Sequence, residues 1–218
     1  MNAVKKKLAL LGGGGHCRSV LDCVLSAGDY DEIGVVERDG CQARDSVLGA
    51  DVIGVDSDLS ALYAQGWTFA FVTLGSVGNS AGRRRLYRRA IELGFTVPVI
   101  ADSSAVLGRG VRLSEGAFVG KRAVVNCGAF VGDCAIVNTG AILEHDCVIG
   151  AFAHIAPGAV LCGNVSVGEG AHVGAGSAVR QGVRIGAGSL IGAGSVVVRD
   201  IPDGVKAFGN PCRVIPSP

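Results

Sequence analysis

Aliphatic side chains recur at every sixth position through the second half of the chain. A small side chain, such as Ala117, Ala141 or Ser177, stands four residues after most of them. An α-helix would need a period near 3.6 and a lone strand a period of 2. The period of six is typical of a hexapeptide-repeat β-helix, in which each hexad forms one short face of a coil. The aliphatic positions are Leu107, Leu113, Val119, Val125, Val131, Val137, Leu143, Ile149, Ile155, Leu161, Val167, Val173, Val179, Ile185, Ile191 and Val197.

The repeat also predicts which residues become neighbours in space. A single hexad cannot bury its apolar side, so stability must come from stacking one coil on the next. With three faces per coil, residues eighteen apart lie above one another at the spacing of paired strands, about 4.8 Å. We therefore expect His172 to stack on His154, and Gly163 to lie directly above His145. The 35 glycines suit the tight corners of such a prism.

The first 95 residues have a different pattern. Short apolar runs at 5–11, 33–36 and 69–74 predict strands, and they alternate with helical spacing at 19–25, 57–64 and 83–93. Alternation of strand and helix indicates a small parallel α/β domain, too short for a complete dinucleotide-binding fold and therefore half-Rossmann-like. We expect three parts: an α/β domain over 1–100, a β-helix over 101–200, and a C-terminal tail over 201–218.

Charge and cysteine content narrow the function classes. Twenty basic and 19 acidic residues leave a net charge of +1, which argues against nucleic acid and an anionic membrane as partners. No apolar run approaches the roughly 18 residues of a membrane helix, and the N-terminus lacks the apolar core of a signal peptide. The eight cysteines form no CxxC pair, so we expect reduced thiols in a cytoplasmic protein. Five arginines, at 83, 84, 85, 88 and 89, follow one predicted helix as a solvated or subunit-facing surface or, alternatively, as phosphate contacts.

A glycine loop over residues 12–15 precedes His16, between the first predicted strand and helix. Unpaired N–H groups and the helix dipole at such a position favour a phosphate. The GxGxxG pattern has Cys17 in place of its third glycine, and a purely structural turn is the alternative. Glu37 and Asp39 follow the second predicted strand, where such folds contact a ribose or base.

The motif Glu144-His145-Asp146 falls at a predicted corner of the prism. Imidazole titrates near neutrality, and a neighbouring carboxylate can fix its tautomer and raise its basicity. Gly163, one coil above, would offer a bare backbone and an N–H group to a carbonyl oxygen. The alternative is an exposed corner histidine between two solvated acids.

Seven motifs, in order along nearly the whole chain, resemble the NeuD-like sugar O- and N-acyltransferases of the hexapeptide-repeat class. They are the segments 11–16, 75–83, 94–100, 137–141, 144–146, 161–165 and 209–213. The resemblance implies a left-handed β-helix, a homotrimer, and active sites in clefts between neighbouring prisms. Two positions depart from the family: Glu37-Arg38-Asp39 replaces consecutive aspartates, which leaves the recognised base open, and Cys212 replaces an alanine.

The resemblance also implies roles for individual residues. His145 would be the general base and Asp146 its carboxylate partner. Asn138 and His154 would line the acceptor and acyl pocket, and Gly163 would donate its N–H group to the thioester carbonyl. The implied substrate-binding set is Gly13, Gly14, His16, Glu37, Asp39, Gly75, Asn138 and His154. The implied coenzyme-binding set is His154, Gly163, Val173, Gly174, Ile185 and Ile191.

The function expected from these features is acetyl-CoA-dependent N-acetylation of a nucleotide-linked amino-deoxysugar, without a metal. An O-acetyltransferase acting on a sialic-acid-type sugar is the nearest alternative, because the same base can serve a hydroxyl group. Two more distant alternatives are a zinc-dependent hydratase with His145, His154 and His172 as ligands, and a non-catalytic binding or scaffold protein.

Overall fold

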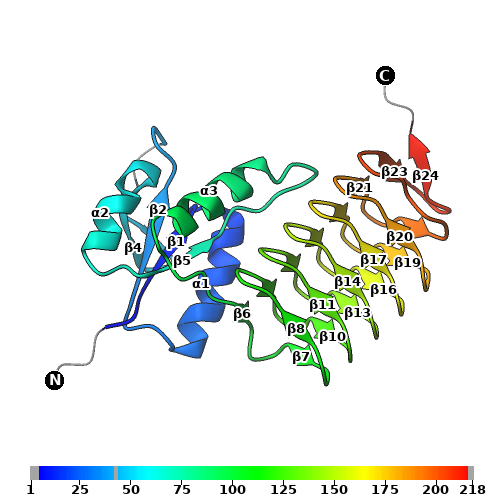
Figure 1. Ribbon diagram of the computed structural model, residues 1–218, viewed down its shortest axis with the longest axis horizontal. Helices are drawn as coiled ribbons and strands as arrows, with labels where there is room; N and C mark the ends of the chain where they lie inside the picture. The colour runs from blue at the N-terminus through cyan, green and yellow to red at the C-terminus, as the bar shows by residue number, and fades with distance from the viewer. Residues whose placement is uncertain (1–4, 42–43, 216–218) are drawn as a thin grey trace. The chain divides into compact units, whose positions relative to one another are not determined.

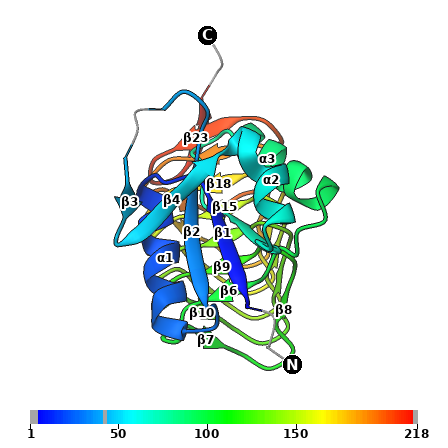
Figure 2. The same ribbon diagram turned by 90° about the vertical axis from the view of Figure 1, so that its left-hand side faces the viewer.

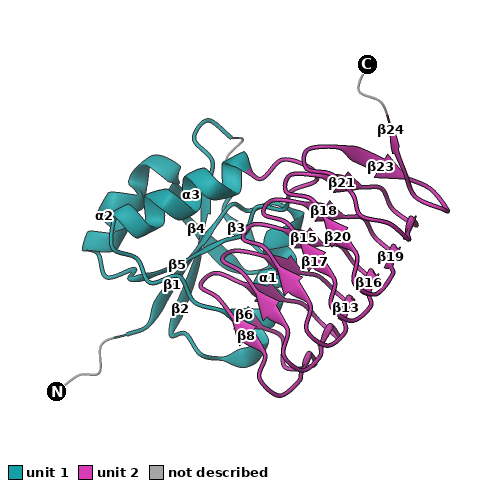
Figure 3. Cartoon of the chain, turned by 45° about the vertical axis from the view of Figure 1, so that its right-hand side comes forward, with its two compact units in different colours: residues 1–75, 81–100 teal, residues 76–80, 101–218 magenta. Residues whose placement is uncertain are grey.

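The computed structural model describes residues 5–41 and 44–215. The chain divides into two compact units (Figure 3). Unit 1 holds the chain as far as Gly75 together with residues 81–100, and unit 2 holds residues 76–80 together with the chain from Ala101. The short segment 76–80, which we expected in the α/β domain, therefore belongs to unit 2.

Unit 1 is an α/β domain built on one five-stranded sheet of order β3-β4-β2-β1-β5. Strands β1, β2, β4 and β5 are parallel, and β3 pairs antiparallel with β4. The strands are β1 (Lys7–Leu11), β2 (Glu32–Glu37), β3 (Ser46–Val47), β4 (Ala50–Val55) and β5 (Phe69–Val72), and the helices are α1 (Gly15–Ala27), the 3-10 turn η1 (Asp56–Asp58), α2 (Leu59–Ala64) and α3 (Ala81–Glu92).

Both faces of this sheet are covered by helices (Figure 2). Alternate residues of a strand point to opposite faces, and Ala9 and Leu11 of β1 share one buried cluster with Leu59 of α2 and Leu86 of α3. Helix α1 packs on the opposite face and contacts β1. Because the four long strands are parallel, the loops that follow β1, β2, β4 and β5 all lie at one edge of the sheet.

Unit 2 is the expected left-handed parallel β-helix, a stack of two-residue strands in three parallel sheets (Figure 1). Each strand from β6 to β19 pairs with the strand eighteen residues further on, as in the register His154↔His172. The strands are β6 (Ile100–Ala101), β7 (Val106–Leu107), β8 (Arg112–Leu113), β9 (Phe118–Val119), β10 (Val124–Val125), β11 (Phe130–Val131), β12 (Ile136–Val137), β13 (Ile142–Leu143), β14 (Val148–Ile149), β15 (His154–Ile155), β16 (Val160–Leu161), β17 (Ser166–Val167), β18 (His172–Val173), β19 (Ala178–Val179), β20 (Arg184–Ile185), β21 (Leu190–Ile191) and β22 (Val196–Val197).

The second residue of each strand pair points into the prism, as the six-residue period predicts. Leu143, Ile149 and Ile155 are fully buried and belong to one continuous core with the small residues of neighbouring hexads. Corners require left-handed backbone, which glycine supplies at most positions. Five other residues supply it as well. Two of them are Asp146 and Asn164, both with φ of 58°, and short polar side chains tolerate this conformation better than most.

Residues 201–215, which we expected as a tail, continue the prism instead. Strand β23 (Lys206–Phe208) pairs parallel with β21, and β24 (Arg213–Ile215) pairs antiparallel with β23. The ring of Phe208 lies against Gly192, where a side chain would collide with it.

In the described part of the chain, every helix falls short of the length and hydropathy that a membrane crossing requires.

Candidate active site

His145 and Asp146 form a hydrogen-bonded pair at the corner between β13 and β14. Nδ1 of His145 lies 2.9 Å from Oδ2 of Asp146. The two side chains are 45% and 58% exposed, so a ligand can reach them. Asp146 can turn its carboxylate back towards the preceding ring because its backbone is left-handed, with φ of 58°. The adjacent histidine and carboxylate expected from the sequence therefore do contact each other.

Two glycines, one coil below and one coil above, make room for this pair. A β-carbon on Gly128 would come 2.5 Å from Oδ1 of Asp146, and one on Gly163 would collide with the His145 ring. A backbone hydrogen bond joins the two coils at this corner, because Asn164 N–H donates to the His145 carbonyl over 2.9 Å. Nε2 is among the ring atoms that face Gly163. The imidazole thus lies over bare backbone, as the eighteen-residue spacing predicts.

The contacts of the ring determine its chemistry. A carboxylate accepts hydrogen bonds, so the neutral imidazole carries its proton on Nδ1 and donates it to Asp146. Nε2 then keeps its lone pair, which is the state a general base requires. Because Nε2 faces Gly163, the base and the backbone of Gly163 border the same space. This corner can therefore remove a proton from a nucleophile next to a backbone N–H group.

A second polar cluster lies at another corner of the same coils. His154 of β15 is buried; its Nδ1 is 2.8 Å from the Ser76 carbonyl oxygen, and its Nε2 is 3.2 Å from Nδ2 of Asn138. Oδ1 of Asn138 accepts from the Thr139 N–H group over 2.8 Å. The Asn138 amide is therefore held at both ends, next to a buried histidine.

The two clusters lie at opposite edges of one face. Asn138 follows β12 and His145 follows β13, and these strands belong to different sheets of the prism. The whole β13 face, residues Ile142–Leu143, separates them. A single prism therefore does not bring His145 into the same pocket as Asn138 and His154.

In unit 1 the glycine loop packs tightly against the end of β2. A side chain on Gly13 would collide with the Glu37 carboxylate, which is 7% exposed and forms an ion pair with Arg44. Gly14 caps α1 without a side-chain hydrogen bond, and a β-carbon there would meet no atom within 4 Å. The N-terminus of α1 is thus open towards solvent at Gly14, which suits an anion.

The end of β5 braces the same loop. The Thr73 hydroxyl donates to the Gly12 carbonyl over 2.6 Å. A β-carbon on Gly75 would lie 3.4 Å from Cβ of His16, so Gly75 and His16 are neighbours. Cys17, in the place of a third glycine, is fully buried, and burial raises the pKa of its thiol to about 11.

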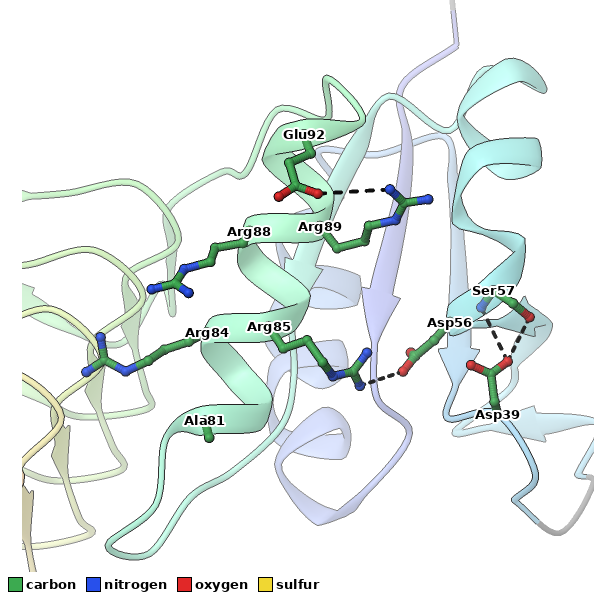
Figure 4. Close-up of a pocket in the computed structure, with 9 residues that line it drawn as sticks. All are labelled: Asp39, Asp56, Ser57, Ala81, Arg84, Arg85, Arg88, Arg89 and Glu92. Atoms are coloured by element: carbon green, nitrogen blue, oxygen red, sulfur yellow. Dashed lines mark hydrogen bonds and ion pairs between the residues drawn. The ribbon is translucent and has the colours of Figure 1, made fainter.

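Asp39 lines a separate cavity of about 510 Å³ at the edge of unit 1 (Figure 4). It accepts hydrogen bonds from the Ser57 hydroxyl over 2.7 Å and from the Ser57 N–H group over 3.3 Å. Arg85 points to Asp56 and forms an ion pair of 2.9 Å with it. Arginines 84, 85, 88 and 89 of α3 line this cavity, so the predicted arginine face borders Asp39.

Three residues of the expected coenzyme set cannot line a surface site with their side chains. Val173, Ile185 and Ile191 are buried in the prism core with no exposed area. They occupy the inward position of their hexads, and their side chains fill the core. A side chain on Gly174 would collide with the backbone of the next coil near Ala193, which accounts for this glycine by packing alone.

The histidines are not grouped as zinc ligands. Among the described residues, no cluster of three or more His, Cys, Asp or Glu side chains is arranged to hold a metal ion. His154 and His172 stack on each other, whereas His145 lies at a different corner.

Sequence reasoning missed two participants. Ser76 contacts His154 across 78 residues of sequence, and no local pattern points to that contact. Gly128 could have been found, because it lies eighteen residues before Asp146 in the same column of the repeat.

Comparisons with known proteins identify the family. The PglD N-terminal domain matches residues 7–90, and the bacterial transferase hexapeptide model matches 146–181 and 164–199. A search of curated protein sequences found no match. Among solved structures, the acetyltransferase domain of PglB from Neisseria gonorrhoeae, in complex with acetyl coenzyme A, has 37% identity and a TM-score of 0.90 and covers 97% of this chain and 100% of that chain.

PerB from Caulobacter crescentus, in complex with CoA and GDP-perosamine, has 39% identity and a TM-score of 0.90, with 98% of this chain and 99% of that chain covered. WeeI from Acinetobacter baumannii has 21% identity and a TM-score of 0.85, and it supports the fold alone. With an α/β unit followed by a hexapeptide prism, and relatives of this similarity over nearly its whole length, the chain belongs to the NeuD-like family of hexapeptide-repeat acyltransferases.

Proposed function

We propose that this enzyme transfers the acetyl group of acetyl-CoA to the amino group of a nucleotide-linked amino-deoxysugar. The observation that carries the proposal is the His145–Asp146 pair at an open corner, with Nε2 facing the bare backbone of Gly163. The relatives support the substrate class: one was solved with acetyl coenzyme A, and another with CoA and GDP-perosamine.

The proposed reaction is a direct transfer in a ternary complex. The sugar amine attacks the thioester carbonyl carbon while Nε2 of His145 takes a proton from the nitrogen. Asp146 keeps the Nδ1–H bond aligned and stabilises the imidazolium that forms. The Gly163 N–H group has no backbone acceptor in the described part of the chain, and it donates to the developing oxyanion. The C–S bond then breaks, and the CoA thiolate leaves and is protonated by the imidazolium, which restores the base.

The nucleotide is assigned to unit 1. Gly14 and the N-terminus of α1 would hold the diphosphate, with Gly13, His16 and Gly75 bordering the loop. Glu37 and Asp39 follow β2, where ribose or base contacts form in α/β folds. Glu37 is already paired with Arg44, so Asp39 is the more accessible carboxylate.

We further propose a homotrimer in which neighbouring prisms complete each site. The outward residues of the face that carries β13 are all aliphatic and at least partly exposed: Val106, Val124, Ile142, Val160, Ala178 and Val196. A column of this kind is typical of a protein–protein interface. A second copy packed on this face would bring the His145 corner of one protomer to the Asn138 corner of the next. His154, beside Asn138, would then border the acyl group.

The eight free cysteines suit a reducing compartment. We therefore propose a cytoplasmic enzyme that supplies an acetylated sugar nucleotide for glycan synthesis.

The direct test is release of the CoA thiol from acetyl-CoA with a panel of UDP-, GDP- and dTDP-linked 4-amino sugars. The expected result is turnover on at least one amino sugar, with a product mass increased by one acetyl group. Turnover on a sialic-acid-type sugar alone would replace the N-acetyl proposal by O-acetylation. Absence of turnover on every sugar would contradict the proposal.

The shared site is tested by complementation. His145→Ala and Asn138→Ala proteins are each expected to be nearly inactive. When the two variants are co-expressed at equal levels, an intact site needs His145 from one variant and Asn138 from the other. This combination should occur at about a quarter of the interfaces. Activity near that fraction of wild type supports a site between protomers, and sedimentation should give three times the 22.0 kDa chain mass. A mixture no more active than the single variants would contradict the shared site.

A further inference from the structure

The reaction proposed above leaves one histidine of the prism without a role. His172 of β18 pairs in register with His154 of β15, one coil below. The two rings are edge to face, with centroids 4.9 Å apart and an interplanar angle of 82°. Both are buried, with 7% of His172 and 9% of His154 exposed. His172 therefore forms one wall of the space in which the His154 ring lies.

The contacts of His154 set the direction of every hydrogen bond around it. The Ser76 carbonyl can only accept, so Nδ1 of His154 carries the proton and donates it over 2.8 Å. Nε2 must then accept from Nδ2 of Asn138, 3.2 Å away. Oδ1 of Asn138 is occupied by the Thr139 N–H group. The remaining N–H of the Asn138 amide is left for a ligand, in an orientation that depends on the ring plane of His154.

One ring nitrogen of His172, Nδ1, is buried without a hydrogen-bond partner among the described residues. Burial lowers the pKa of His172, and the nearby Ser76 carbonyl opposes that effect only in part. A buried nitrogen without a partner is unfavourable. The ring of His172 contacts the His154 ring edge to face, with centroids 4.9 Å apart.

We propose that His172 is a positioning residue for acetyl transfer. Its ring holds the His154 imidazole in the plane that allows Nε2 to receive the Asn138 amide, and the amide in turn presents its second N–H to the reacting groups. This role rests on the proposed function, because it assumes that Asn138 faces the acceptor or acyl group.

The kinetic test compares His172→Ala with His172→Phe. Alanine removes the wall beside His154, so kcat is expected to fall about tenfold while the KM for acetyl-CoA stays within twofold, because only the orientation of a polar group is lost. Phenylalanine retains a ring of similar shape and is expected to keep at least half of the wild-type kcat. Ser166→Ala, at the equivalent outward position of β17, is the matched control and should behave as wild type.

A double-mutant cycle with Asn138→Ala separates positioning from general damage. If His172 acts through the amide, adding His172→Ala to Asn138→Ala should lower kcat no further. Additive losses would overturn the proposal, as would a His172→Ala enzyme with wild-type kcat. Equal losses of kcat in His172→Ala and His172→Phe would also overturn it, because a ring of similar shape would then fail to replace the contact of His172 with His154.

A second measurement does not depend on turnover. The chain has only 4 histidines, so their ¹⁵N-labelled imidazole signals can be assigned by single substitutions. We expect a slowly exchanging Nδ1–H signal from His154 in the wild type and in His172→Phe, and its loss in His172→Ala. Persistence of that signal in His172→Ala would refute the positioning role. If no nucleotide sugar were acetylated, the proposed function would fail, and the signal would still show whether His172 holds the His154 ring in place.

Discussion

Replacement of Gly163 by alanine tests the position of the proposed base without removing it. The φ angle of Gly163 lies outside the left-handed region, so the backbone accepts alanine. The added β-carbon would come within 2.9 Å of three atoms of the His145 ring, Nε2 among them. The ring is at an exposed corner, so it will swing into solvent rather than displace the coil. The Gly163 N–H group remains, so the variant separates the base from the oxyanion donor.

The size of the effect follows from these contacts. A misplacement of about 1 Å costs on the order of 10²-fold in rate, and a general base as a whole contributes roughly 10²–10⁴-fold. We expect kcat to fall about 10²-fold, equivalent to about 2.7 kcal/mol in activation free energy. The lost His145–Asp146 contact is exposed and contributes at most about 1 kcal/mol to stability. The Tm should therefore change by less than about 4 °C for a chain of this length.

The assay is thiol release at saturating acetyl-CoA and sugar nucleotide, with thermal unfolding followed by circular dichroism. Gln181→Ala is the matched control, because Gln181 occupies the same corner column one coil further on and Gly182 N–H donates to the Gly163 carbonyl there. The control should keep wild-type kcat. A Gly163→Ala enzyme with kcat within twofold of wild type would refute the role assigned to the His145 ring, and a large fall in Tm would refute the local character of the change.

Three further predictions concern other parts of the chain. His145→Ala should lower kcat by roughly 10²–10⁴-fold with an unchanged unfolding curve, because it removes the base from an exposed corner. A variant with more than half of the wild-type kcat would exclude His145 as the general base. Gly14→Val should raise the KM for the sugar nucleotide and not for acetyl-CoA. The β-carbon of the new side chain meets no protein atom within 4 Å, so the side chain would occupy the open space proposed for the diphosphate. His16→Ala should act in the same direction more mildly, and a selective effect of either variant on the KM for acetyl-CoA would reverse the assignment of the two ligands. Burial lowers the pKa of His172, so the unfolded chain binds the extra proton and stability should fall as pH drops below about 6.5. His172→Phe should reduce the fall of Tm between pH 7 and pH 5. An unchanged slope of Tm against pH would contradict the role of His172 in this pH dependence.

The repeat sequence determined the register of the prism. An inward aliphatic side chain every six residues can be buried only if the coils stack, and stacking forces residues eighteen apart into contact. The positions of Gly163 above His145 and of His172 above His154 follow from that arithmetic and are confirmed. The alternation of strand and helix before residue 95 likewise predicted the parallel sheet and the glycine loop at its edge.

The period of six also predicted which side chains are buried. Val173, Ile185 and Ile191 occupy inward positions, and their side chains fill the core. Contact of these positions with the coenzyme stays a prediction of the resemblance.

Only the tertiary structure decided how distant segments meet. The contact of Ser76 with His154 spans 78 residues and depends on the path of a loop, which no local period encodes. The same holds for residues 201–215, where β23 and β24 extend a sheet after the repeat has ended. Periodic burial specifies local register because each hexad meets the same environment, whereas contacts made once in the chain depend on side-chain geometry that only the folded molecule defines.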